Sequence, residues 1–198
     1  MVTRNNYVAD IATFFPPQGR WTEADFFALP EVMRIVELAN GELIVNAAAL
    51  PLHQLVITEL LDCALQILVR EQKLGIVLTA NTALRLWEGN IREPDILFIR
   101  AEHTDWIGKR YVEGADWVCE VISRGTKKVD EVDKLRDYAK AGIPEYWLID
   151  PKKRTIRVYA LRGGEAYILA GTYAAGETAS SETIKGFQVS VDQVFTSI

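Results

Sequence analysis

The chain has 198 residues, of which 49% are hydrophobic and 25% charged, and its formal net charge is −5. This length is ordinary for one domain with a buried core, and the composition excludes a disordered chain. The acidic balance argues against a protein that binds nucleic acid through a basic field over its whole surface, and two cysteines exclude a disulfide framework or a CxxC metal site.

The first part of the chain is expected to form an arm, a short helix, a hairpin and a long helix. Residues 1–20 are expected to be an N-terminal arm, and residues 21–198 a single domain. Residues 22–25 resemble a capping box, which begins a short helix. The Asn-Gly dipeptide at 40–41 favours a type I′ turn between two apolar runs. Apolar residues recur at every third or fourth position over residues 52–73, which predicts the longest helix.

The second part of the chain alternates strands with one further helix. Gly89 and Asn90 are expected to lie in a loop, whereas a hairpin is predicted around Gly163-Gly164. Because the order of elements is mixed, the fold class is predicted as α/β or mixed α+β, with one central sheet flanked by helices. The expected strands span about residues 75–80, 83–87, 94–100, 116–122, 145–150, 154–161 and 165–171, and the second helix residues 128–141.

No segment has the composition of a signal peptide or of an uninterrupted membrane span. The most apolar stretch, residues 50–69, is broken by polar side chains that include His53, Glu59 and Asp62. We therefore expect a cytoplasmic protein without a membrane partner.

Two carboxylates occupy positions where charge is costly. Asp95 begins an apolar run, and Glu120 lies inside another, Val118 to Ile122. Runs that are apolar on both faces are typical of central strands. A lone charge there must be compensated by a basic partner or by a divalent cation. A salt bridge, or a strand end that is more exposed than the pattern suggests, explains the two residues equally well.

The helix predicted after Glu120 carries a lysine that would compensate such a charge. On a helical wheel Val129, Val132, Leu135 and Ala139 form an apolar stripe, with Lys134 on its flank. Lys134 would then turn back toward the sheet edge that carries Glu120. The alternative is a solvated lysine with an i,i+4 partner. Asp130 and Tyr138 share the flank with Lys134, at spacings of four.

Two further residues are candidates for the same chemistry. Glu42 follows the predicted hairpin turn, and its alternative is an exposed hairpin residue. His53 stands near the start of the long helix, where a capping or packing role is the alternative.

The segment from Glu120 to Pro151 resembles the signature of the Uma-two family, whose members belong to the PD-(D/E)XK restriction-endonuclease-like fold. The resemblance extends from about residue 20 to about residue 190. Two positions depart from the wider pattern: Ile122 stands where the lysine of that pattern is found, and Arg124-Gly125-Thr126 replaces the usual sequence after Ser123. The matching residues are Gly41-Glu42, Pro51 to His53, Pro94-Asp95, Glu120 to Ser123, Asp130, Lys134 and Gly142 to Pro151.

This resemblance implies an endonuclease that uses Mg²⁺, with Mn²⁺ as an alternative, to hydrolyse phosphodiester bonds of DNA. Asp95, Glu120 and the backbone carbonyl of Val121 would hold the ion, and Glu42 would join them directly or through water. Lys134 would orient the attacking water and stabilise the developing charge. Without metal the carboxylates would repel each other, so at least one raised pKa is expected.

Partners follow from the same resemblance. Local basic groups at Arg124, Lys127 and Lys128 would contact nucleic acid, although each is also explained as a solvated surface charge. Nothing in the sequence selects DNA over RNA or another phosphate ester. An inactive nuclease-fold module for nucleic-acid binding or dimerisation is a second hypothesis. Such folds often pair through an exposed edge, which favours a homodimer that the sequence itself does not show.

Overall fold

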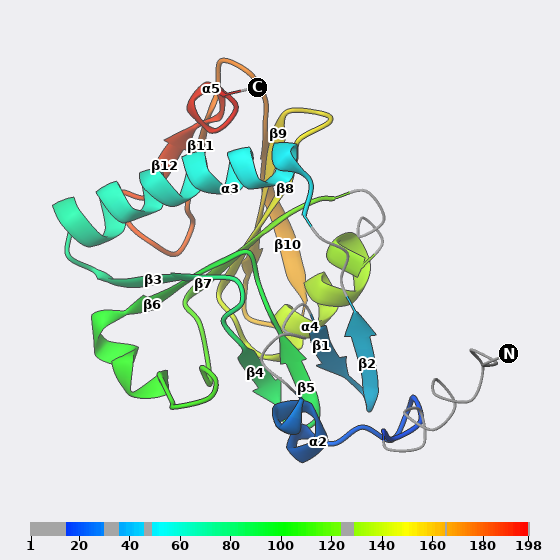
Figure 1. The fold of residues 1–198 in the computed structure, drawn as a ribbon. Helices are drawn as coiled ribbons and strands as arrows, with labels where there is room; N and C mark the ends of the chain where they lie inside the picture. Colours follow the sequence, from blue (N-terminus) through cyan, green and yellow to red (C-terminus); the bar gives the residue numbers. More distant parts are fainter. Residues whose placement is uncertain (1–14, 30–35, 46–48, 124–128, 165, 198) are drawn as a thin grey trace, which may run out of the picture.

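The computed structural model describes residues 15–29, 36–45, 49–123, 129–164 and 166–197. Its centre is a large mixed sheet, which the long helix α3 (Pro51–Ala64) crosses, and a smaller sheet lies beside it (Figure 1). The expected mixture of strands and helices around a central sheet is confirmed.

The large sheet has six strands in the order β10-β9-β8-β7-β6-β3. β7 and β8 run parallel, and the other neighbouring strands run antiparallel. β6 and β7 are interior strands, as their apolar residues on both faces predicted. The six strands are β3 (Gly75–Thr79), β6 (Ile96–Arg100), β7 (Trp117–Val121), β8 (Glu145–Asp150), β9 (Thr155–Leu161) and β10 (Tyr167–Tyr173).

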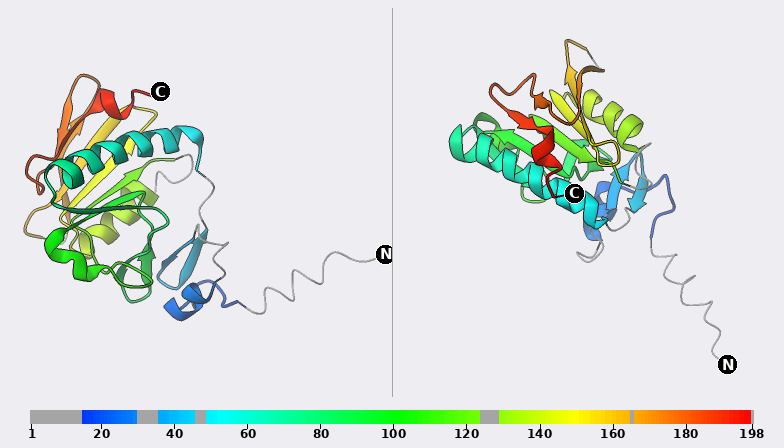
Figure 2. Two further views of the ribbon diagram at one scale, coloured as in Figure 1. Left: turned by 60° about the vertical axis from the view of Figure 1, so that its left-hand side comes forward. Right: turned by 90° about the horizontal axis from the view of Figure 1, so that it is seen from above.

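The side chains of β7 show how the sheet divides the core into two layers. Trp117, Cys119 and Val121 belong to a cluster formed with α3 (Pro51–Ala64). Val118 points to the other face, where it packs in a cluster with Tyr138 of α4 (Leu135–Lys140). α3 and α4 therefore cover opposite faces of the sheet (Figure 2). By the alternation of a strand, Glu120 faces the α4 side.

The α3 face is completed by the C-terminal elements. β11 (Thr178–Ser180) and β12 (Gln188–Ser190) form a two-stranded ladder, and α5 (Val191–Val194) follows it. Buried residues of these elements belong to the same cluster as the core residues of α3.

The long helix continues beyond α3 as a π-helical segment, Leu65–Glu71. By length and composition alone, Pro51–Glu71 is apolar enough to cross a membrane, with a mean hydropathy of 1.5. Its residues Val56, Leu60 and Leu68 are fully buried and form part of the core against the sheet. A core helix meets the same criterion of length and composition.

The smaller sheet has four antiparallel strands in the order β2-β1-β5-β4. Asn40 and Gly41 both have positive φ, as a type I′ turn requires, so the predicted hairpin is confirmed. Its strands are β1 (Val36–Ala39), β2 (Glu42–Val45), β4 (Leu84–Trp87) and β5 (Asn90–Arg92), and α2 (Glu23–Ala28) begins with the predicted capping box.

Two expectations about local structure were wrong. Asn90 lies in β5 rather than in a loop. The prediction missed this strand because three residues are too few to show any periodicity. Val132 is 52% exposed instead of lining an apolar stripe. Residues Val129–Lys134 form a π-helical turn, whose i→i+5 bonds rotate the following side chains away from the positions of an ideal wheel.

The proposed arm lies mostly outside the described residues, which begin at residue 15. The part that is described contacts the hairpin: the side chain of Gln18 donates to the carbonyl of Leu43 and accepts from its N–H, at 2.9 and 2.7 Å. The ring of Phe15 stacks on Trp21.

Candidate functional site

The two carboxylates singled out in the sequence lie close together in the fold: Asp95 directly precedes β6, and Glu120 lies in the neighbouring strand β7. β6 and β7 pair with Ile96 opposite Cys119, so continuing this register by one residue places Asp95 opposite Glu120. The Asp95 carboxylate bends toward the strand end, where its Oδ2 accepts a hydrogen bond from the Val121 N–H at 2.7 Å.

Lys134 reaches these strands from the helix that connects β7 to β8. Its Nζ lies 2.8 Å from Oε1 of Glu120, so the expected approach to the sheet is confirmed. The i,i+4 contact with Asp130 also exists, at 3.7 Å. One turn later, the hydroxyl of Tyr138 donates to the same Glu120 oxygen at 2.6 Å. Asp130, Lys134 and Tyr138 are all buried.

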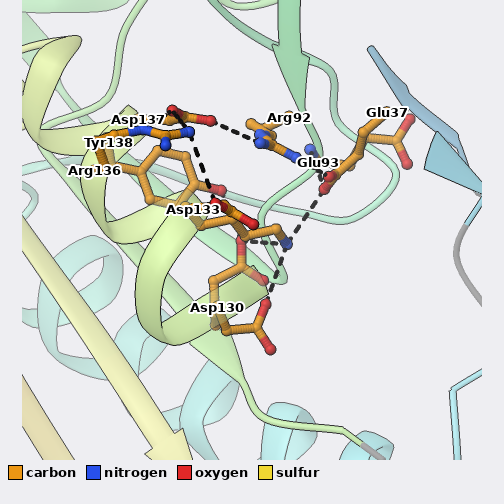
Figure 3. A network of polar contacts seen from close by, with 10 residues as sticks. Glu37, Arg92, Glu93, Asp130, Asp133, Arg136, Asp137 and Tyr138 are labelled. Atoms are coloured by element: carbon orange, nitrogen blue, oxygen red, sulfur yellow. Dashed lines mark hydrogen bonds and ion pairs between the residues drawn. The ribbon is translucent and has the colours of Figure 1, made fainter. Parts of the chain in front are cut away.

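A second buried group, which sequence reasoning missed, contains Glu37, Arg92 and Asp137 (Figure 3). Oε1 of Glu37, in β1, lies 3.2 Å from the Lys134 Nζ. The other Glu37 oxygen accepts from Nη1 of Arg92 at 2.8 Å, and Nη2 of Arg92 donates to Asp137 at 2.6 Å. The side chains of Glu37, Arg92 and Asp137 are almost completely buried. Both sheets and the connecting helix therefore meet in one network of charges.

Burial and charge set the protonation of this network. Burial raises the pKa of Glu120 well above its usual value, and the charge of Lys134 only partly opposes this. Burial would lower the pKa of the Lys134 ammonium, but the carboxylates around it outweigh burial and raise that pKa. In Glu37 the balance is reversed: burial would raise the pKa, and the charges of Lys134 and Arg92 lower it. The expectation of a raised carboxyl pKa in the metal-free protein is confirmed for Glu120.

His53 lies beside Asp95 at the start of α3. Its Nε2 is 3.2 Å from Oδ2 of Asp95, while its buried Nδ1 has no hydrogen-bond partner among the residues described. Burial would lower the pKa of His53, but the hydrogen bonds to Asp95 and to the backbone of Val121 raise it above its usual value. The structure thus brings His53 to Asp95 and Val121, two of the proposed metal ligands.

Other candidates are not brought to this place. Glu42 is exposed at the start of β2, opposite Ala39, and the carboxylate of the hairpin that reaches Lys134 is Glu37. Arg124, Lys127 and Lys128 lie outside the described residues. The sequence did contain a signal for Glu37, because Val36 and Leu38 flank it as apolar residues flank Glu120.

The donor set suits a hard cation that keeps part of its water shell. Oδ2 of Asp95 and Oε1 of Glu120 take the contacts to described residues, which leaves the second oxygen of each carboxyl for a ligand. Across the part of the chain that the structure describes, no cluster of three or more His, Cys, Asp or Glu is placed to hold a metal. Mg²⁺ is commonly bound through one or two carboxylates, with water and phosphate oxygens completing the octahedron, so the residues present fit it.

Comparisons with known proteins identify the family and the fold. The model of the Uma2 family, described as a putative restriction endonuclease, matches residues 23–192. A crystal structure of a putative nuclease belonging to DUF820 from Anabaena variabilis is similar, with a TM-score of 0.67 and 19% sequence identity over 88% of this chain and 97% of that chain. The comparison with curated proteins gave no match. The similarity to the crystal structure shows the fold, and the predicted restriction-endonuclease-like class is confirmed.

Proposed function

The chain belongs to the Uma2 family, and we propose that it is a Mg²⁺-dependent endonuclease that hydrolyses phosphodiester bonds of DNA. The observation that carries the proposal is the buried contact of Lys134 with Glu120, on the strand next to Asp95. A lysine ammonium held between carboxylates at a strand end can stabilise the negative charge that develops when water attacks a phosphate.

Each residue of the site has a distinct role in this proposal. Asp95, Glu120 and the carbonyl of Val121 hold the ion. When bound, Mg²⁺ supplies a polarised phosphate and a more acidic water. Lys134 directs its ammonium at that water and at the phosphate, where negative charge develops. Tyr138 fixes the orientation of Glu120 through the hydrogen bond to Oε1.

Exposed basic residues lie at the same end of the sheet. Because β7 and β8 are parallel, the turn after β8 lies beside the end of β7. Lys152 and Lys153 are exposed in this turn, and Arg124, Lys127 and Lys128 follow β7 in the sequence. We propose that these cations contact the DNA backbone, which a net charge of −5 makes a weak and salt-sensitive interaction.

Incubation of a plasmid with the pure protein tests the proposal. Cleavage is expected with Mg²⁺ or Mn²⁺ and is lost with EDTA. Asp95→Asn and Lys134→Met should each lower the rate by about 10²-fold or more. Glu102→Gln is a matched control, because Glu102 is an exposed carboxylate beyond the opposite end of β6.

Three outcomes would change the conclusion. Absence of cleavage with either metal would leave the hypothesis of an inactive binding module. Cleavage of RNA in preference to DNA would show that RNA, not DNA, is the substrate. Equal cleavage by wild type and Asp95→Asn would refute the assigned site.

A further inference from the structure

Glu37 holds a position between two buried cations. Its Oε1 lies 3.2 Å from Lys134 Nζ and accepts a hydrogen bond from the Glu93 N–H, also at 3.2 Å. Its Oε2 accepts from Arg92 at 2.8 Å. Both oxygens are therefore engaged, and the side chain is 1% exposed. A carboxylate held in this way has a fixed position and a fixed charge.

The contacts of Glu37 reach the proposed catalytic residues through Lys134. A lysine has a flexible stem and a compact ammonium, so one contact does not fix where the ammonium points. Glu120 supplies one contact from the large sheet, and Glu37 supplies another from the small sheet. Asp130, on the same helix, is a more distant partner at 3.7 Å. Since Glu120 also serves the proposed ion, Glu37 is the closest partner of the ammonium that is not a proposed ligand of the ion.

Arg92 links the position of Glu37 to that of the helix. Its guanidinium bonds Glu37 on one side and Asp137 on the other. Asp137 follows Lys134 by three residues, on the next turn of the same helix. A planar guanidinium that holds two carboxylates sets the distance between them. The backbone of the lysine and its ammonium are thus both tied to the small sheet.

We propose that Glu37, held by Arg92, is a positioning residue that keeps the ammonium of Lys134 directed at the reacting phosphate. This inference rests on the proposed nuclease function. It assigns to the small sheet a part in the reaction, although Asp95 and Glu120 lie on the large one.

The kinetic test compares Glu37→Gln with Asp137→Asn. Both residues are buried carboxylates and partners of Arg92, but only Glu37 contacts the Lys134 ammonium. Glu37→Gln should lower kcat by roughly 10- to 100-fold while KM for DNA changes by less than about twofold. Asp137→Asn loosens Arg92 but leaves the contact of Glu37 with the ammonium, so it should lower kcat clearly less than Glu37→Gln does. An equal loss of kcat in both variants would indicate a structural role and overturn the proposal.

A double variant separates action through Lys134 from any other effect. If Glu37 acts through the lysine, Glu37→Gln combined with Lys134→Met is no slower than Lys134→Met alone. Multiplied losses in the double variant would contradict the inference. If Glu37→Gln does not fold, Glu37→Asp keeps the charge on a shorter side chain, and wild-type kcat in folded Glu37→Asp would also contradict it.

A spectroscopic measurement does not depend on cleavage. The Lys134 ammonium, assigned with Lys134→Met, should give a slowly exchanging signal in a proton–nitrogen correlation spectrum. We expect that signal to be lost in Glu37→Gln and kept in Asp137→Asn. A protein that cuts no substrate but shows this pattern would refute the nuclease function alone, whereas an unchanged signal in Glu37→Gln would refute the positioning role.

Discussion

The substitution Glu145→Gln should destabilise the fold strongly, because five hydrogen bonds converge on this carboxylate. Glu145 is fully buried in β8. Its Oε1 accepts from the indole N–H of Trp147. Its Oε2 accepts from the hydroxyl of Ser181, from the N–H of Glu182 at 2.8 Å, and from the N–H and hydroxyl of Thr183. The central strand thereby holds the loop before β12.

A glutamine preserves the shape but replaces one oxygen by an amino group. The least costly orientation points this group at the single donor, the indole of Trp147. One bond to a charged acceptor, worth about 1.5–3 kcal/mol, is then lost, and the others weaken as the charge disappears. We expect a loss of about 3 kcal/mol, against a typical total of about 5–15 kcal/mol.

Urea unfolding followed by tryptophan fluorescence measures this loss. The control is Glu182→Gln, which removes the exposed ion pair with Arg162 and should cost about 0.5 kcal/mol or less. A loss below about 1 kcal/mol in Glu145→Gln would show that the carboxylate is not the anchor that its contacts indicate.

Three further predictions concern the hairpin and the charge network. Gly41→Ala should cost about 2–3 kcal/mol, because its φ is +77° and a Cβ would lie 2.8 Å from the backbone of Gly19, whereas Gly176→Ala, with φ of +81° and open space, should cost about 1 kcal/mol in the same urea assay. If Mn²⁺ binds at the proposed site, the increase in melting temperature that it causes should shrink as the pH falls, since Glu120 must lose a proton to bind the ion. An increase that does not depend on pH would contradict the raised pKa of Glu120. The pKa of Glu37 is lowered in the folded state, so the ionised carboxylate stabilises the fold above its usual pKa of 4.5, and this stabilisation is lost as the pH falls through the folded pKa. The difference in unfolding free energy between wild type and Glu37→Gln, measured by urea unfolding, should therefore decrease in acid.

The sequence alone predicted the contact between Glu120 and Lys134, because a charged residue in an apolar strand is a strong physical signal. Glu120 in an apolar strand required compensation, and the spacing of the following helix supplied Lys134. Repulsion between the carboxylates predicts a raised pKa, whereas in the structure burial is the largest cause of the raised pKa of Glu120 and the neighbouring carboxylates add to it.

The other half of the site depends on contacts that no local pattern reveals. Arg92 meets Glu37 and Asp137, which lie 55 and 45 residues away in the sequence. Pairing across two sheets is set by tertiary packing, and the three-residue strand that carries Arg92 is too short to be recognised. Glu42 was predicted as a candidate metal ligand because it follows the turn. Glu37 is the residue with the apolar neighbours that distinguish a buried carboxylate.

The parallel pairing of β7 with β8 obliges the chain to cross from one end of the sheet to the other, and Lys134 lies on the helix of this crossover. The lysine and Glu120 therefore belong to parts of the molecule that need not open together. Detachment of the helix would leave the sheet paired but remove the ammonium from Glu120. The site therefore requires the docked helix as well as the completed sheet.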